Sequence, residues 1–79
     1  MPIKKIEILG TGCSKCKSLE ASAREAVERL GIDAEITKVE KLDEIIARGV
    51  MVTPAIAVDG EIKSSGRVLS AADVEKLLA

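Results

Sequence analysis

The chain has 79 residues, of which 47% are hydrophobic, and its 12 basic and 13 acidic residues give a formal net charge of −1. With that balance and no polybasic block, we expect neither nucleic acid nor an anionic membrane as a partner. Phe, Tyr, Trp and His are all absent. The lack of aromatic rings removes the stacking platform used for single-stranded nucleic acid. The lack of histidine excludes Cys-His and Ser-His catalysis and histidine zinc ligands.

A chain of this length predicts a single domain over residues 1–79, with a core of Ile, Leu, Val and Ala. No apolar run approaches the roughly 20 residues that a membrane span needs. The apolar stretch after Lys4 and Lys5 is too short for a signal peptide, and Glu7 interrupts it. We therefore expect a cytoplasmic protein. In that compartment thiols are kept reduced, so a pair of nearby cysteines is more often catalytic or metal-binding than a structural disulfide.

The first half of the chain predicts a strand, a helix and a second strand. The strands are residues 3–9, ending at Gly10, and Ala34–Val39, and the helix between them is Ser14–Leu30. Gly31 is well placed as the residue after the helix end. At helical spacing, one stripe of the helix should be buried: Cys16, Leu19, Ala23, Ala26, Val27 and Leu30.

The second half predicts a short helix, a β-hairpin and a last helix. The helix is 41–48, and the hairpin strands Ala55–Val58 and 61–64 flank an Asp59-Gly60 turn. The last helix, 70–78, begins with a Ser70 to Asp73 capping pattern. The predicted inward residues are Leu42, Ile45 and Ile46 in the first helix and Val74, Leu77 and Leu78 in the second.

This order, β-α-β-α-β-β-α, predicts an α/β fold. The first two strands should be parallel and joined by a right-handed crossover, and the hairpin should add antiparallel strands. The result is a mixed four-stranded sheet with three helices covering its faces.

Both cysteines lie in residues 10–17, GTGCSKCK, and their positions are unequal. Cys16 lies on the predicted buried stripe. Cys13 lies at the start of the helix, where unpaired backbone N–H groups and the helix dipole stabilise a thiolate. Lys15 and Lys17 add a modest positive charge nearby. The expected mechanism is that Cys13 attacks a substrate disulfide and Cys16 resolves the mixed disulfide.

A metal-binding CxxC module is the alternative. Copper-chaperone domains resemble the chain up to about Leu30, but they usually carry Met where this chain has Thr11, and they end on a strand rather than on a helix. Two thiolates without histidine cannot complete a tetrahedral zinc site in one chain. Two chains could still pool four cysteines around zinc or an iron–sulfur cluster, so a dimeric metal module stays open.

Three segments resemble thioredoxin-fold proteins, in particular the small redox-active disulfide proteins of the thioredoxin and glutaredoxin type. They are GTGCSKC at the first strand–helix junction, VTPAIAVDGEI at the third strand and hairpin, and SSGRVLS before the last helix. The resemblance implies a thioredoxin-like fold and a thiol–disulfide oxidoreductase that reduces disulfide-containing proteins. It implies a thioredoxin-reductase-like electron donor and no cofactor or metal beyond a redox-active Cys13–Cys16 disulfide. We expect a monomer.

The resemblance also implies roles for individual residues. Cys13 matches the nucleophile and Cys16 the resolving cysteine. Pro54 matches the family's cis-proline, and Thr53 before it would offer backbone hydrogen bonds to the substrate chain. Gly66 matches a glycine near the substrate groove, although it could equally be a turn residue.

Glu7 lies six residues before Cys13, where thioredoxins place a buried acid that assists the resolving thiol. If Glu7 is buried, it could take a proton from Cys16. The other interpretation is that Glu7 merely occupies a partly exposed strand position.

The chain also departs from the family. Thioredoxin's Trp-Cys-Gly-Pro-Cys is Gly-Cys-Ser-Lys-Cys here, and the Cys-Pro-Tyr-Cys of glutaredoxin is not matched. These differences leave the redox potential unassigned and transfer no glutathione site. A non-catalytic binding module that uses the Pro54 groove is a third hypothesis.

Overall fold

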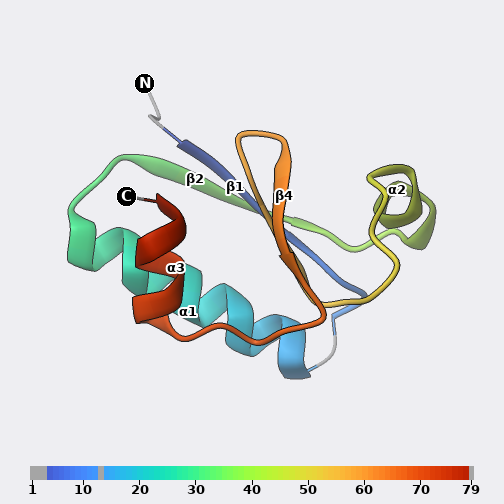
Figure 1. The fold of residues 1–79 in the computed structure, drawn as a ribbon, viewed down its shortest axis with the longest axis horizontal. Coiled ribbons are helices and arrows are strands. Elements are labelled where there is room, and N and C mark those ends of the chain that lie inside the picture. Colours follow the sequence, from blue (N-terminus) through green and yellow to red (C-terminus); the bar gives the residue numbers. More distant parts are fainter. Residues whose placement is uncertain (1–3, 13, 79) are drawn as a thin grey trace.

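The computed structural model describes residues 4–12 and 14–78, which form one mixed sheet and three helices (Figure 1). The strands are β1 (Lys4–Leu9), β2 (Ala34–Val39), β3 (Ala55–Val58) and β4 (Glu61–Ser65), in the spatial order β2-β1-β3-β4. β1 pairs with β2 in parallel and with β3 antiparallel, and β3 pairs antiparallel with β4. The predicted sheet and element order are confirmed, and β4 extends one residue beyond its predicted end.

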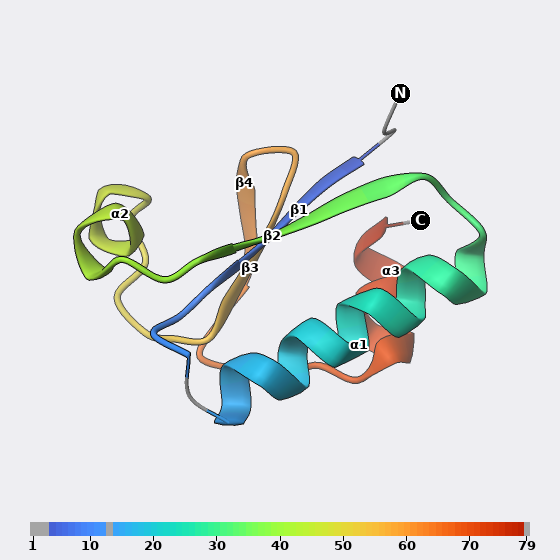
Figure 2. The same cartoon turned by 180° about the vertical axis from the view of Figure 1, so that it is seen from behind.

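The helices are α1 (Ser14–Leu30), α2 (Leu42–Ala47) and α3 (Ala71–Leu78). Figures 1 and 2 show α1 and α3 side by side on one face of the sheet, with α2 apart from them at one end. α2 is one residue shorter at each end than predicted, because Lys41 is extended and Arg48 is the C-cap. Among the described residues, no helix is long and apolar enough to cross a membrane.

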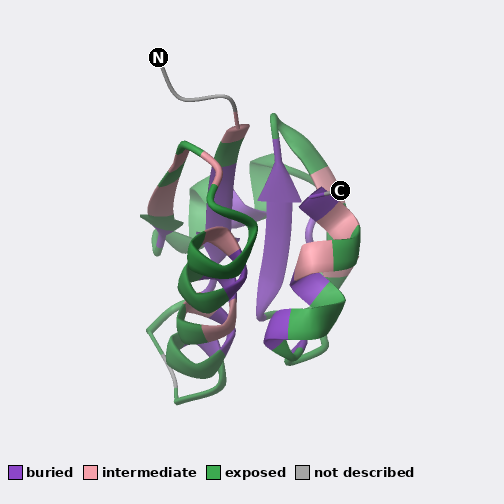
Figure 3. Cartoon of the chain, turned by 90° about the vertical axis from the view of Figure 1, so that its left-hand side faces the viewer, coloured by how far each residue is buried: buried purple, intermediate pink, exposed green. Residues whose placement is uncertain are grey.

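The buried side chains form two clusters, one on each face of the sheet. The larger packs α1 and α3 against the sheet and contains Ile6, Ile8, Leu19, Ala23, Ala26, Ile56, Val58, Leu69, Val74 and Leu78. The smaller packs α2 and contains Leu9, Val39, Ile45, Val50, Ala55 and Ala57. Figure 3 shows the buried central strands behind the helices. The two inner strands, β1 and β3, contribute to both clusters and form the centre of the fold.

Three side chains predicted to be buried are exposed. Leu42 and Ile46 are 60% and 58% exposed, because the six-residue α2 directs only Ile45 into the smaller cluster. Leu30 is 38% exposed at the last position of α1, where the chain turns at Gly31 toward β2. The amphipathic pattern was correct for most of α1 and wrong for these positions.

Local signals in the sequence were reliable. Asp59 and Gly60 both have positive φ angles, 53° and 84°, as the predicted two-residue hairpin turn requires. At the start of α3, the Asp73 N–H donates to Ser70 Oγ at 3.2 Å, and the Ser70 N–H donates to Asp73 Oδ2 at 3.4 Å. These two hydrogen bonds form the reciprocal capping box that the sequence predicted.

We expect Ser70→Ala to lower the free energy of unfolding by about 1 kcal/mol, because the Asp73 N–H loses its capping acceptor. Urea denaturation followed by far-ultraviolet circular dichroism measures this in a chain without aromatic residues. Ser18→Ala, at an exposed position inside α1, is the matched control and should not destabilise the protein. Equal stability of wild type and Ser70→Ala would contradict a stabilising cap.

Candidate active site

The candidate site lies where β1 ends, α1 begins and the segment before β3 passes (Figures 1 and 2). Cys16 lies in the first turn of α1 and is only 6% exposed, so its predicted burial is confirmed. Cys13, the predicted nucleophile, lies outside the described residues.

Gly10 leaves the space that the Cys16 sulfur occupies. A Cβ atom on Gly10 would overlap Cys16 Sγ, and it would lie 3.9 Å from the Cα of Pro54. The Gly10 N–H donates to the Val39 carbonyl at 2.9 Å and so continues the pairing of β1 with β2. The sequence predicted only that the first strand ends at Gly10. Its closeness to the sulfur depends on how α1 folds back over β1, which no local pattern reveals.

The three predicted substrate-binding residues lie on adjoining segments. The Thr53–Pro54 peptide bond is cis, with Pro54 buried and Thr53 exposed. The Gly66 N–H donates to the Pro54 carbonyl at 2.8 Å. Gly66 has a φ of 75°, and a Cβ there would lie 2.8 Å from Val52 Cγ1. Gly66 thus allows close approach of the two segments, while its role in binding substrate stays a prediction.

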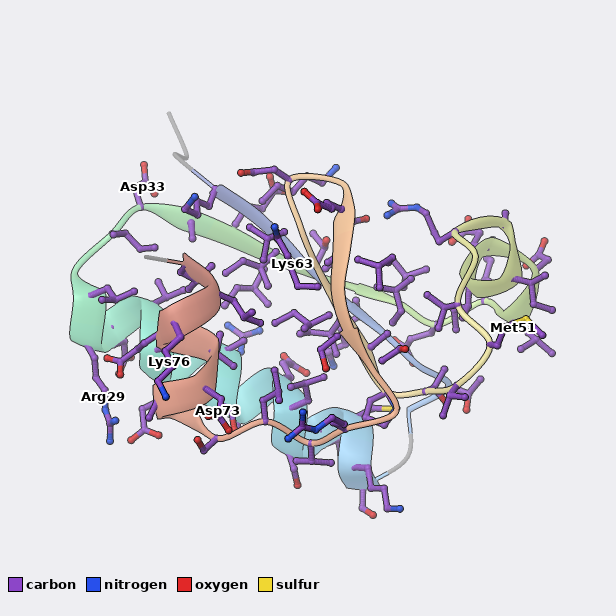
Figure 4. The ribbon with its side chains drawn as sticks, viewed as in Figure 1. Arg29, Asp33, Met51, Lys63, Asp73 and Lys76 are labelled. Carbon is purple, nitrogen blue, oxygen red and sulfur yellow. The ribbon has the colours of Figure 1, made fainter. Side chains whose placement is uncertain are left out.

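Apolar side chains border these segments on the outside. Met51 is 90% exposed and points away from the molecule beside α2 (Figure 4). Val52 is 57% exposed, and Val68, shortly after Gly66, is 46% exposed. The segments that adjoin the cis-proline therefore expose several apolar side chains.

Glu7 is buried, and its carboxylate is paired with Arg48. Its side chain is 6% exposed, Arg48 Nη1 donates to Oε1 at 2.9 Å, and Nη2 donates to Oε2. The hydrogen bond to Glu7 raises the pKa of the Arg48 guanidinium further above its usual value. A hollow of about 350 Å³ beside α2 is lined by Glu7 and Arg48. The proton-acceptor role of Glu7 stays a prediction, and the partner found for its carboxylate is Arg48.

A separate pocket of about 110 Å³ is lined by Cys16 together with Ile8, Gly10 and Gly12. Its charged lining comes from α1 and from the end of β2: Lys17, Glu20, Lys38 and Glu40. No sequence pattern singled out this group, because its members are scattered over 24 positions and carry no motif.

Two of the charged groups in the pocket hold each other in place. Glu20 accepts a hydrogen bond from Arg24 Nη2 at 2.7 Å, and Lys38 Nζ lies 3.3 Å from its other carboxylate oxygen. The hydrogen bond from Arg24, helped by Lys38, lowers the pKa of Glu20 below its ordinary value. Glu20 is therefore a fixed negative charge at neutral pH. In the described part of the chain, no group of three or more Cys, Asp or Glu side chains could hold a metal ion.

Comparison with known proteins identifies the family of this site. A family model described as "Thioredoxin domain" matches residues 4–79. The chain belongs to the thioredoxin-domain family. A thioredoxin of Methanothermobacter thermautotrophicus is 51% identical over 75 residues, which cover 95% of this chain and 97% of that protein. A thioredoxin of Methanocaldococcus jannaschii is 45% identical over 73 residues, which cover 92% of this chain and 84% of that one.

Membership confirms the thioredoxin-like fold and identifies the protein as a thiol–disulfide oxidoreductase. Thioredoxins need no cofactor beyond their redox-active disulfide. The metal-binding alternative is not favoured by these relatives.

We expect Gly10→Ala to lower the free energy of unfolding by about 1–3 kcal/mol, because the added methyl group overlaps the Cys16 sulfur. The same change in a Cys16→Ala background should cost clearly less, because only the Cys16 Cβ remains, 3.3 Å from the added atom. Urea denaturation of the four proteins gives the coupling between the two sites. Equal costs in both backgrounds would show that the sulfur is not the obstacle.

Proposed function

We propose that Cys13 and Cys16 form a redox-active pair that reduces protein disulfides. Cys13 thiolate attacks one sulfur of the substrate disulfide, and the other substrate sulfur leaves as a thiolate. Cys16 then loses its proton and attacks Cys13 Sγ, which releases the second substrate thiolate and leaves a Cys13–Cys16 disulfide. Two electrons have passed from the dithiol to the substrate.

One observation supports this division of roles above all: Cys16 is buried at the junction of Gly10, Pro54 and the charged pocket. A sheltered thiol cannot meet a protein substrate first, yet it can attack a neighbouring mixed disulfide. The relatives named thioredoxin are consistent with that division.

The substrate chain is proposed to lie across Thr53, Pro54 and Gly66. Thr53 is exposed, whereas Pro54 and the strand after it are buried, so Thr53 is the accessible residue next to the cis peptide bond. The exposed side chains of Met51, Val52 and Val68 supply apolar contact on either side. Backbone pairing with shallow apolar contacts accepts many sequences, which suits a general protein reductant.

We further propose a cytoplasmic protein that acts as a monomer and is re-reduced by a thioredoxin-reductase-like donor. A cytoplasmic dithiol must be returned to its reduced state after each cycle, and the thioredoxin-domain match supports a reductase as the electron donor. Neither nucleic acid nor a membrane is proposed as a partner, since the net charge is −1.

We expect Cys13→Ser to abolish the reduction of insulin disulfides, and Cys16→Ser to accumulate mixed disulfides with insulin chains. Turnover with dithiothreitol as donor and mass spectrometry of trapped adducts measure the two outcomes. In the wild type, Cys13 should be alkylated at least about tenfold faster than Cys16 at pH 7, as an activated thiolate requires. Turnover by Cys13→Ser would end this mechanism. Stoichiometric zinc or iron in the purified protein would favour the metal module instead.

We expect Gly66→Ala to raise the KM for insulin by about fivefold to tenfold, because the new side chain displaces Val52 and misplaces the adjoining substrate segment. The rate of Cys13 alkylation should not change. Gly60→Ala is the matched control: Gly60 also has a positive φ, 84°, but nothing lies within 4 Å of an added Cβ. An unchanged KM for Gly66→Ala would remove this residue from the proposed groove.

A further inference from the structure

We infer that Glu40 accepts the proton that Cys16 releases when it resolves the mixed disulfide. This inference rests on the proposed roles of the two cysteines and adds a residue that neither the motif nor the family match assigns. The proton acceptor is thus a residue of the pocket that Cys16 lines, and not Glu7.

The pocket supplies the first observation. Cys16 is buried, yet it lines the same pocket of about 110 Å³ as Glu40. That volume is several times what one water molecule needs, and a polar lining favours water. A proton leaving the Cys16 sulfur can therefore pass through the pocket by way of water.

The charges in the pocket supply the second observation. Lys17 and Lys38 are cations that stabilise a thiolate but offer no acceptor. Glu20 accepts a hydrogen bond from Arg24 and forms an ion pair with Lys38. Both interactions lower the pKa of Glu20 and make it a poor proton acceptor. Glu40 is the remaining acid. It is exposed and forms no ion pair with any residue of 4–12 or 14–78.

The position of Glu40 in the fold supplies the third observation. Glu40 follows the last residue of β2, and its Oε2 lies 3.4 Å from where a Cβ on Gly12 would be. The carboxylate therefore lies close to Gly12, the residue that precedes Cys13 in the sequence. The Glu7 carboxylate, by contrast, accepts hydrogen bonds from Arg48 beside α2, and Glu7 does not line this pocket.

The Cys16 S–H bond breaks, its proton passes through water to the Glu40 carboxylate, and the Cys16 sulfur forms a bond to Cys13 Sγ. The bond between Cys13 and the substrate sulfur breaks with its electron pair, and the substrate leaves as a thiolate. Glu40 then returns its proton to solvent.

Stopped-flow reaction of the reduced protein with excess 5,5′-dithiobis(2-nitrobenzoate) separates the two steps. The first thionitrobenzoate is released by Cys13 at a rate that scales with reagent concentration. The second is released by Cys16 at a rate that does not. At pH 7 we expect Glu40→Gln to slow the second phase about tenfold, toward the low end of what a positioned acid–base group contributes, and to leave the first phase within about twofold.

Two further readouts distinguish proton transfer from a structural effect. The second phase of Glu40→Gln should recover at alkaline pH, where hydroxide removes the proton, and added acetate should restore part of it at pH 6–7. Glu35→Gln, which removes an exposed charge from the same strand, is the control and should match the wild type.

An unchanged second phase in Glu40→Gln, or a slow phase that neither alkaline pH nor acetate restores, would overturn the assignment. A slow second phase in Glu7→Gln with a normal Glu40→Gln would return the role to Glu7. If the wild type releases no second thionitrobenzoate by a reagent-independent step, the proposed roles of the cysteines fail instead.

Discussion

Burial of strand β1 on both faces is the constraint on which the rest of the structure depends. Ile6 and Ile8 pack beneath α1 and α3, while Leu9 packs beneath α2. A charge at Glu7, in the middle of such a strand, is tolerated because Arg48 supplies two hydrogen bonds to it. The strand must then end where the chain can turn into α1 without filling the space of the Cys16 sulfur. Gly10 meets that requirement, so the packing of the core determines where the redox centre lies.

The same arrangement makes the two faces of the sheet chemically different at the end where the site lies. On the side of α1, the buried sulfur of Cys16 meets a small pocket with charges of both signs. Beside α2, the carboxylate of Glu7 is neutralised by a guanidinium. An acid close in sequence to the CxxC motif thus has a structural partner, and acids from α1 and the end of β2 line the pocket next to Cys16. Proximity along the chain was a poor guide to proximity in space.

Sequence patterns predicted the parts of the fold that depend on local physics. Helical spacing placed Cys16 in the core, and the Asp59-Gly60 turn and the capping box of Ser70 were read from a few adjacent residues. The patterns failed where contact with an element far away in the sequence decides whether a side chain is buried or which partner it has. Ile46 has the spacing of a core residue, yet α2 is too short to bury it. The pairing of Glu7 with a residue 41 positions away leaves no local trace either.

The brevity of α2 has a consequence for the motions of the molecule. Six residues cannot hold a helix in water by themselves, no side chain caps α2 at Lys41, and only Ile45 is buried. Its folded state therefore depends on Ile45 and on the bond from Arg48 to Glu7. Regions with so few buried contacts open locally at a free energy well below that of global unfolding. The backbone amides of α2 should exchange with solvent while those of β1 stay protected. Such a partial opening frees the carboxylate of Glu7 and leaves Cys16 packed beside Gly10.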